Sequence, residues 1–179
     1  MDESHVSRGA DADASLDGLT ALYASQVVDV YGFVFRRCGG DVGLAEDITQ
    51  ETFVAAARHF RLNADVPSPA WLYQVARSRL IDHWRAEARK ERKVRLVAGG
   101  RATQPASDPA DVIVSGRRVV AALSELPATQ HAALVLRYLD GYTTKDVATT
   151  LNRSVKATES LLARARRNLE AVYQEQDGE

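Results

Sequence analysis

The sequence contains a single cysteine, Cys38, and a single methionine among 179 residues. One cysteine excludes an internal disulfide, and it excludes a metal site built from cysteines. The histidines are scattered without the spacing of a ligand set, at His5, His59, His83 and His131. We therefore expect no metal and no cofactor, and we interpret Cys38 as a structural or incidental thiol.

The sequence also lacks a signal peptide and any apolar run that we expect to span a bilayer. It has no Ser-His-Asp order and no glycine-rich phosphate loop, so no catalytic residue is assigned and an enzyme is not expected. These absences predict a reduced, cytoplasmic protein without membrane insertion.

Net charge is nearly absent, at −1, which excludes a general attraction to nucleic acid. The charges are nevertheless segregated. Residues 1–17 carry five acids and one Arg, and residues 168–179 carry four acids and no base. Between Arg77 and Arg101, nine Arg and Lys residues stand against three acids. Binding to nucleic acid would therefore depend on local patches, and on a partner for the remaining affinity.

Apolar residues recur at helical spacing, which predicts an all-α protein. Residues 1–14 are polar and acidic, and we expect them to be disordered. A first helix is predicted from Ser15, a suitable N-cap, to the Gly39-Gly40 pair. Its inward positions are predicted to be Leu16, Leu19, Tyr23, Val27, Val30 and Val34.

A second helix is predicted after Asp41, with Leu44, Ile48, Phe53, Ala57 and Phe60 inward. Two carboxylates and an amide share its outer face because they are spaced at i, i+3 and i+4; they are Asp47, Gln50 and Glu51. This face has two interpretations. It is either a solvated surface or a docking surface for a basic partner helix.

A loop is predicted at Arg61–Ser68, and Pro69 then opens a basic helix that extends to Arg95. The apolar stripe of this helix is predicted to be Leu72, Val75, Ala76, Leu80 and Trp84. The helix is either a solvated, salt-bridged surface helix or a surface that follows a nucleic-acid backbone. Trp84 either projects from it or is a core aromatic residue.

After Arg95 the periodicity fails in a segment rich in Gly, Ala, Pro, Ser and Asp, which predicts a flexible linker. Beyond it, the pattern predicts short helices with Val119, Val120, Leu123, Leu126, Ala132, Val135, Leu136 and Leu139 inward. Thr143 and Asp146 then form a capping-box-like start, Asn152 makes a tight turn, and Ser154 caps a last helix.

This order of short helix, tight turn and second helix is that of a helix-turn-helix. Val147, Ala148 and Leu151 are expected inward in the first of its two helices. Val155, Thr158, Leu161 or Leu162, and Ala165 are expected inward in the second. Five bases and one acid occupy Arg153–Arg167. Helical hairpins of this shape occur without DNA, but the basic second helix favours DNA binding.

Taken together, AEDITQETF, WLYQVARSRLIDHWR and the segment from Leu126 to Leu169 resemble the bacterial sigma factors of the sigma-70 family, in the small extracytoplasmic-function (ECF) group. The resemblance implies two small helical domains joined by a flexible linker. These are a region 2 domain at 15–95, a linker at 96–114 and a region 4 helix-turn-helix domain at 115–175, before a tail at 176–179.

The resemblance also implies partners and residue roles. The partners are core RNA polymerase, promoter DNA and an anti-sigma factor. Core polymerase would be bound by Asp47, Gln50, Glu51 and Phe53. The promoter −10 element would be read and opened by Asn63, Asp65, Ser78, Arg79, Asp82, Arg85 and Arg89, with Lys93 holding phosphate. The −35 element would be read by Arg153, Ser154, Lys156, Ala157, Glu159, Ser160, Arg164 and Arg167.

Several residues depart from the family pattern. Ser78 stands where members usually carry Asn. The recognition helix reads VKATESLLARAR, where relatives often read VGTVKSRLHRAR, so Glu159 and Leu161 replace usually basic residues and Lys156 replaces Gly. A carboxylate facing the bases favours cytosine N4, and we therefore expect an unusual −35 sequence.

Two other functions fit the same residues. An autonomous helix-turn-helix regulator would need a dimer interface and strong DNA affinity of its own. A sigma-like decoy that titrates an anti-sigma factor would not need the basic patch, since it would hold no phosphates.

We predict that Glu159→Lys changes the −35 preference in a promoter library, because it replaces an acceptor of base protons with a donor. Arg164→Ala serves as the contrast. If Arg164 holds only phosphate, its loss weakens binding by a similar factor for every sequence. An unchanged preference in Glu159→Lys would rule out a base contact there.

Overall fold

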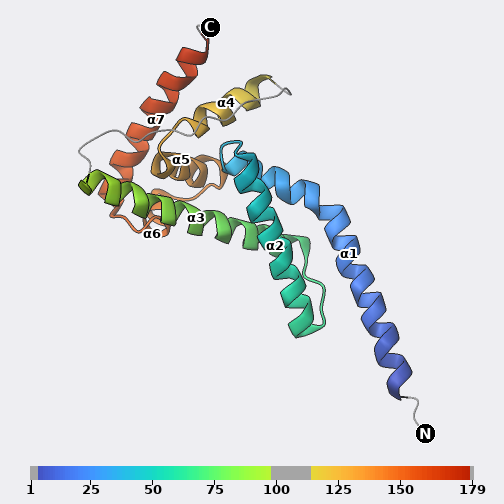
Figure 1. The fold of residues 1–179 in the computed structure, drawn as a ribbon. Coiled ribbons are helices and arrows are strands. Elements are labelled where there is room, and N and C mark those ends of the chain that lie inside the picture. The colour runs from blue at the N-terminus through green and yellow to red at the C-terminus, as the bar shows by residue number, and fades with distance from the viewer. Residues whose placement is uncertain (1–3, 98–113, 178–179) are drawn as a thin grey trace. The chain divides into compact units, whose positions relative to one another are not determined.

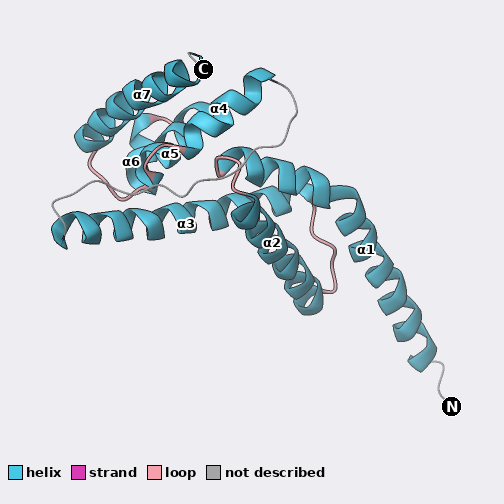
Figure 2. Ribbon diagram, turned by 45° about the horizontal axis from the view of Figure 1, so that its top comes forward, coloured by secondary structure: helices cyan, strands magenta, loops and turns pink. Residues whose placement is uncertain are grey.

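The structure, a computed structural model, describes residues 4–97 and 114–177. Almost all of the expected linker lies outside these residues. The described part is built from helices and contains no strand, which confirms the all-α prediction (Figures 1 and 2). The helices are α1 (Ser4–Arg37), α2 (Val42–Asn63), α3 (Pro69–Val97), α4 (Val114–Ser124), α5 (Ala128–Leu134), the π-helix η1 (Val135–Leu139), α6 (Thr144–Thr150) and α7 (Val155–Asp177).

The helices form two compact units, and the division falls inside α3. The first unit takes α1 as far as Phe35, α2, and α3 as far as Arg79. The second takes Arg36–Asp41, which we call the hinge segment, and the chain from Leu80 onward. The second half of α3 therefore packs with α4–α7, whereas the sequence pattern placed all of α3 in the first domain.

The core of the first unit is formed where the apolar stripes of its helices meet. Val30, Val34, Ile48, Leu72 and Ala76 are each less than 5% exposed. Thr49 and Thr52 are also buried, and each hydroxyl donates to the backbone carbonyl four residues earlier. This local bond satisfies the hydroxyl, so each Thr is buried without leaving its hydroxyl unpaired.

Helix α1 differs from the prediction at its start and along its inward face. It begins at Ser4, where disorder was expected, and the segment between Ser4 and Ser15 contains no proline that would stop it. Tyr23 is half exposed and contacts the Phe53 ring edge-on, while Leu22 and Phe33 are buried. Among the predicted inward residues whose exposure is described, Val30 and Val34 are fully buried and Leu19 and Val27 are half-buried, so only Tyr23 lies outside the predicted inward face.

We expected no apolar run long enough to span a bilayer, and one helical segment meets that criterion. The segment Asp17–Arg37 is long and apolar enough to cross a bilayer by length and composition alone. Its Val30 and Val34 are fully buried in the protein, and Asp29 lies in its middle. Core helices of soluble proteins pass the same test, so this segment is weak evidence for a membrane span.

The connection between α2 and α3 is shorter than predicted. Helix α2 continues through Asn63, so the first part of the expected loop is helical. Ala64 then takes a left-handed backbone conformation, with φ of 52°, and donates to the carbonyl of Phe60. The Ser68 hydroxyl accepts from the Trp71 amide at 3.3 Å, so Ser68 caps α3.

In the second unit, α4, α5 and α6 all pack against α7. The predicted core positions Leu123, Leu126, Val147, Ala148 and Leu151 are buried. On α7, Thr158 and Ala165 are buried, and so are both Leu161 and Leu162. Helical spacing predicted that either Leu161 or Leu162 would face inward, and the structure buries both.

Helix α5 ends in a π turn, and this changes which residues face inward. Leu139 is 45% exposed, although helical spacing placed it in the core. Residues Val135–Leu139 form the π-helix η1, which adds a residue to the turn and rotates the following side chains. Val119 is also exposed and Val120 is half-buried, although both were expected inward.

The turn chemistry of the helix-turn-helix follows the prediction closely. Thr143 and Asp146 form a complete capping box at the start of α6. The two hydrogen bonds from Thr143 lower the pKa of Asp146. Gly141 and Asn152 both take the left-handed conformation, with φ of +72° and 52°. The Ser154 hydroxyl accepts from the Ala157 amide at the start of α7.

Asn152 provides a test of this turn. Asn152→Ala should lower the free energy of unfolding by about 1 kcal/mol, because alanine resists the left-handed conformation. Asn152→Gly removes the same side chain but tolerates that backbone, so it should stay near the wild-type value. Urea unfolding of the full chain measures both, and equal losses in the two variants would contradict this account.

Candidate functional site

The acidic face predicted on α2 is present. Asp47, Gln50 and Glu51 are all exposed on that helix. Glu51 contacts Arg79 at 3.3 Å, and both side chains remain about half exposed. An exposed pair of this kind contributes little stability and exchanges partners readily. Phe53 is different, because its ring is half-buried against Tyr23, with 4.9 Å between the ring centroids.

The two polar residues near the end of α2 are exposed, but they do not form a pocket. Asn63 donates to the carbonyl of His59 at 3.0 Å, so its side chain folds back on its own helix. Asp65 is exposed beyond the left-handed Ala64. Both are accessible to a partner.

The predicted contacts on α3 share one helical face. Ser78, Asp82, Arg85 and Arg89 follow one another at steps of four, three and four residues. All are exposed except Arg85, which is half-buried. Trp84 lies on the other side of the helix and is 3% exposed, so it is a core aromatic residue and does not project.

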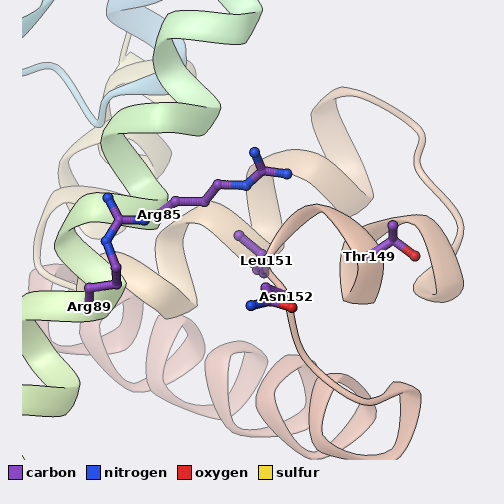
Figure 3. Close-up of a pocket in the computed structure, with 5 residues that line it drawn as sticks. All are labelled: Arg85, Arg89, Thr149, Leu151 and Asn152. Carbon is purple, nitrogen blue, oxygen red and sulfur yellow. The ribbon is translucent and has the colours of Figure 1, made fainter.

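Arg85 has a partner that the sequence did not indicate. Its Nε donates to the backbone carbonyl of Thr150, at the end of α6, at 2.7 Å. Figure 3 shows the Arg85 side chain extending away from α3 toward α6. The same place is an open pocket lined by Arg85, Arg89, Thr149, Leu151 and Asn152.

On α7, the predicted contacts lie opposite the buried stripe. Lys156, Ala157, Glu159, Ser160, Arg164 and Arg167 are exposed, as is Ser154 before the helix. Arg153 is half-buried in the turn, and its amide donates to the carbonyl of Ala148. Leu161 is 7% exposed, so the departure at that position concerns the core and not the outer face.

The hinge segment carries a set of buried polar contacts that sequence analysis missed. The Arg37 guanidinium contacts the Asp140 carboxylate at 2.9 Å, with side-chain exposures of 11% and 0%. The His131 Nε2 lies 2.9 Å from the Arg37 carbonyl. Arg37 and Asp140 are 103 positions apart, and no local pattern links them.

Burial also sets the charge states near the hinge segment. It lowers the pKa of His131 to about 4 and lowers that of His83 as well. His131 is therefore neutral at pH 7, and its Nε2–H can donate to the Arg37 carbonyl. Burial raises the pKa of the Cys38 thiol to about 12. In the described residues, no three His, Cys, Asp or Glu side chains gather as metal ligands.

Two family models match the chain in order along the sequence. One is described as sigma-70 region 2 and matches residues 22–90. The other is described as sigma-70, region 4 and matches residues 116–169. The second match spans α4 to most of α7, including the helix-turn-helix.

Curated relatives are similar over nearly the whole chain. The ECF RNA polymerase sigma factor SigM of Bacillus subtilis is 32% identical, over 85% of this chain and 93% of that protein. SigL of Mycobacterium tuberculosis is 31% identical, over 96% and 97%. Among solved structures, RpoE of Bartonella quintana, in complex with the anti-sigma factor NepR, has a TM-score of 0.48 and 21% identity, over 87% and 96%.

The environment of Cys38 predicts an unreactive thiol. At pH 8 the native protein should react with a thiol reagent roughly a thousandfold more slowly than the urea-unfolded chain, because the thiolate fraction falls tenfold per pKa unit. Cys38→Ser is the blank, since it removes the only thiol. Equal rates in the native and unfolded protein would show that the hinge segment leaves Cys38 open.

Proposed function

Because the chain belongs to the ECF RNA polymerase sigma factors, we propose that it binds core RNA polymerase and directs initiation at a specific class of promoter. The observation that carries this proposal is the ordered pair of region 2 and region 4 matches within one small chain. We retain the domain limits 15–95 and 115–175, with 96–114 as the linker and 176–179 as the tail. The compact units divide the chain differently, within α3.

The acidic face of α2 is the proposed docking surface for core polymerase. Asp47, Gln50 and Glu51 offer exposed acceptors on one helical face, which suits a basic partner helix. The Arg79 partner of Glu51 does not compete strongly, because their contact is exposed to solvent. We assign Phe53 a supporting role, since its ring holds α2 against Tyr23.

The −10 element is the proposed ligand of α3 and of the residues before it. Base opening costs a few kcal/mol per base, and this cost must be offset by contacts to the extruded base and to the backbone. Asn63, Asp65, Ser78 and Asp82 are short polar groups suited to base edges. Arg79, Arg85, Arg89 and Lys93 are suited to phosphates.

The −35 element is the proposed ligand of the outer face of α7. In a helix-turn-helix the second helix enters the major groove with its N-terminal residues toward the bases. Ser154, Lys156, Ala157, Glu159 and Ser160 occupy that end of α7. Arg153, Arg164 and Arg167 flank it and are suited to phosphates.

We assign the protein no catalytic step, no cofactor and no metal, and we place it in the cytoplasm with the polymerase. An anti-sigma factor is a further proposed partner. A net charge of −1 suits a protein that reads DNA only within a larger assembly, because the assembly supplies the remaining phosphate contacts.

The proposal is tested by reconstitution with purified core RNA polymerase and transcription from a random promoter library. Promoter-specific transcripts should appear with the wild-type chain. The double variant Asp47→Lys, Glu51→Lys should bind core polymerase roughly a hundredfold more weakly, because like charges would face each other across the interface.

The matched control is Asp29→Lys, Glu46→Lys, which makes the same charge change at two exposed acids outside the proposed surface. It should transcribe like the wild type. Tight DNA binding without polymerase binding would favour the autonomous regulator. Polymerase binding without promoter-specific transcripts would favour the decoy.

A further inference from the structure

Helix α1 is apolar on the side that faces away from the core of the first unit. Its segment Asp17–Arg37 is apolar enough to cross a bilayer, yet only 17% of that apolar stretch is buried. Val30 and Val34 are fully buried, whereas Val28 is 76% exposed. Two residues turn a helix by about 200°, so Val28 points nearly opposite to Val30. The core therefore accounts for one side of α1 and leaves a second apolar side.

This second side is a continuous stripe, which we call the outer stripe. Its members lie three, four and seven residues from Val28 in both directions, which is the spacing of one helical face. Besides Val28 they are Ala21, Ala24, Ser25, Tyr31, Gly32 and Phe35. The members up to Val28 are exposed, and the three after it are half-buried. An apolar surface that continues over about four helical turns is typical of an interaction site.

The two halves of the outer stripe differ in side-chain size. The three members before Val28 are Ala or Ser, whereas Tyr31 and Phe35 follow it. The Tyr31 and Phe35 rings are stacked, with 5.8 Å between their centroids and 21° between their planes. One half of the stripe is therefore a raised aromatic surface, and the other half is a shallow surface of small side chains.

These halves fit each other when two copies of α1 run antiparallel. With a two-fold axis at Val28, each position faces the one at the same distance on the other side of Val28. Phe35 of one copy then faces Ala21 of the other, and Tyr31 faces Ser25. Large side chains thus meet small ones, as close packing requires. A parallel pair would instead set the rings against each other and leave a gap between the small residues.

The charges at the ends of the outer stripe are also complementary in an antiparallel pair. Asp17 and Arg36 are both exposed on α1. Asp17 lies about three turns before Val28, so it comes within about 4.5 Å, along the helix axis, of Arg36 in the other copy. A long Arg side chain spans that distance. Asp29 lies about 100° around the helix from Val28, so it stays in water at the rim.

We propose that two copies of this chain pair antiparallel along the outer stripe of α1. This inference goes beyond the proposed function and does not depend on it. The stretch from Asp17 to Arg36 is about 28 Å long. One helix face of this length buries less than the roughly 800 Å² per partner of a typical stable complex. The dimer is therefore weak, with a Kd on the order of 10 µM.

A lipid surface fits the outer stripe less well than a second copy. Helices that lie on membranes carry Lys and Arg beside their apolar face. Between Asp17 and Arg36, the chain has two acids and one base. Anionic lipids would be repelled by Asp17, whereas a second copy offers it Arg36.

Sedimentation equilibrium of the full chain, from about 1 µM to about 200 µM, should show a rise from the monomer mass to the dimer mass. Val28→Lys puts a charge at the two-fold axis, where it meets its own copy, and should weaken the dimer roughly tenfold or more. Because Val28 is 76% exposed, this variant should unfold at the same urea concentration as the wild type. The matched control is Val54→Lys, at a Val on α2 that is 50% exposed, and it should dimerise like the wild type.

A charge exchange tests the ends of the stripe. Asp17→Arg and Arg36→Asp each bring like charges together between the two copies, and each should weaken the dimer roughly fivefold. The double variant restores opposite charges in exchanged places, so it should dimerise nearly as well as the wild type. A double variant weakened by the product of the two single effects would contradict the pairing of these residues.

The antiparallel orientation is tested by disulfide formation in a Cys38→Ser background, which contains no other thiol. Val28→Cys lies at the two-fold axis and should link to its own copy on mild oxidation. Ala21→Cys should not, because the two copies of that position would be about 21 Å apart. A disulfide needs Cα atoms within about 7 Å. Equal linking at both positions would indicate a parallel pair and overturn the proposal.

A chain that stays monomeric at about 200 µM would also overturn the proposal. So would a dimer that Val28→Lys leaves unchanged. A monomer that floats with vesicles of phosphatidylglycerol and phosphatidylcholine, and loses this binding in Val28→Lys, would assign the outer stripe to a lipid surface instead. Transcription by the reconstituted holoenzyme tests the proposed function separately, so either can fail while the other stands.

Discussion

The packing of the α3 stripe is the constraint on which the rest of the structure depends. Leu72, Ala76, Leu80, Trp84 and Ala88 recur at four-residue steps, and all are buried. The first two belong to the first compact unit and the last three to the second. Because the face of α3 that carries Leu72, Ala76, Leu80, Trp84 and Ala88 is buried, the charged residues of the helix lie on its other faces. The basic surface of α3 is thus a consequence of how the helix is buried, as well as of its composition.

Much of this fold could be predicted because local chemistry decides it. The capping box of Thr143 and Asp146, the left-handed Asn152 and the Ser154 cap each depend on residues at most three positions away. Burial of Thr158, Leu161, Leu162 and Ala165 on α7 followed from helical spacing, but Val155, which was also expected inward, is 44% exposed at the start of the helix. These features are determined by backbone hydrogen bonding and steric limits, which depend on residue types that can be read from the sequence.

The errors have a common physical origin in contacts that no local pattern reveals. Leu139 left the core because η1 inserts a residue, and helical spacing has no signal for a π turn. Tyr23 was placed inward by spacing, but it is half exposed and contacts Phe53 edge-on. Trp84 could not be assigned until its burial was known. For Leu139 and Tyr23, tertiary structure overrode the spacing of a regular helix, whereas the burial of Trp84 agrees with the predicted apolar stripe.

The candidate site was predictable to a similar extent. Exposure of the acidic residues on α2 and of the outer face of α7 followed from the same helical spacing. The partner of Arg85 did not, because Thr150 is 65 positions away and contributes only a backbone carbonyl. Any residue type at that position would present the same oxygen. Because the acceptor is a backbone oxygen, the sequence gives no signal for this contact, and the three-dimensional structure is needed to find it.

The buried ion pair of Arg37 and Asp140 fixes geometry more than it adds stability. A buried ion pair gains little net stability, since the loss of hydration offsets most of the attraction between the charges. It does fix one geometry, because either charge left alone and buried would be strongly unfavourable. Arg37 and Asp140 would therefore specify how α5 and η1 meet the hinge segment without holding them irreversibly.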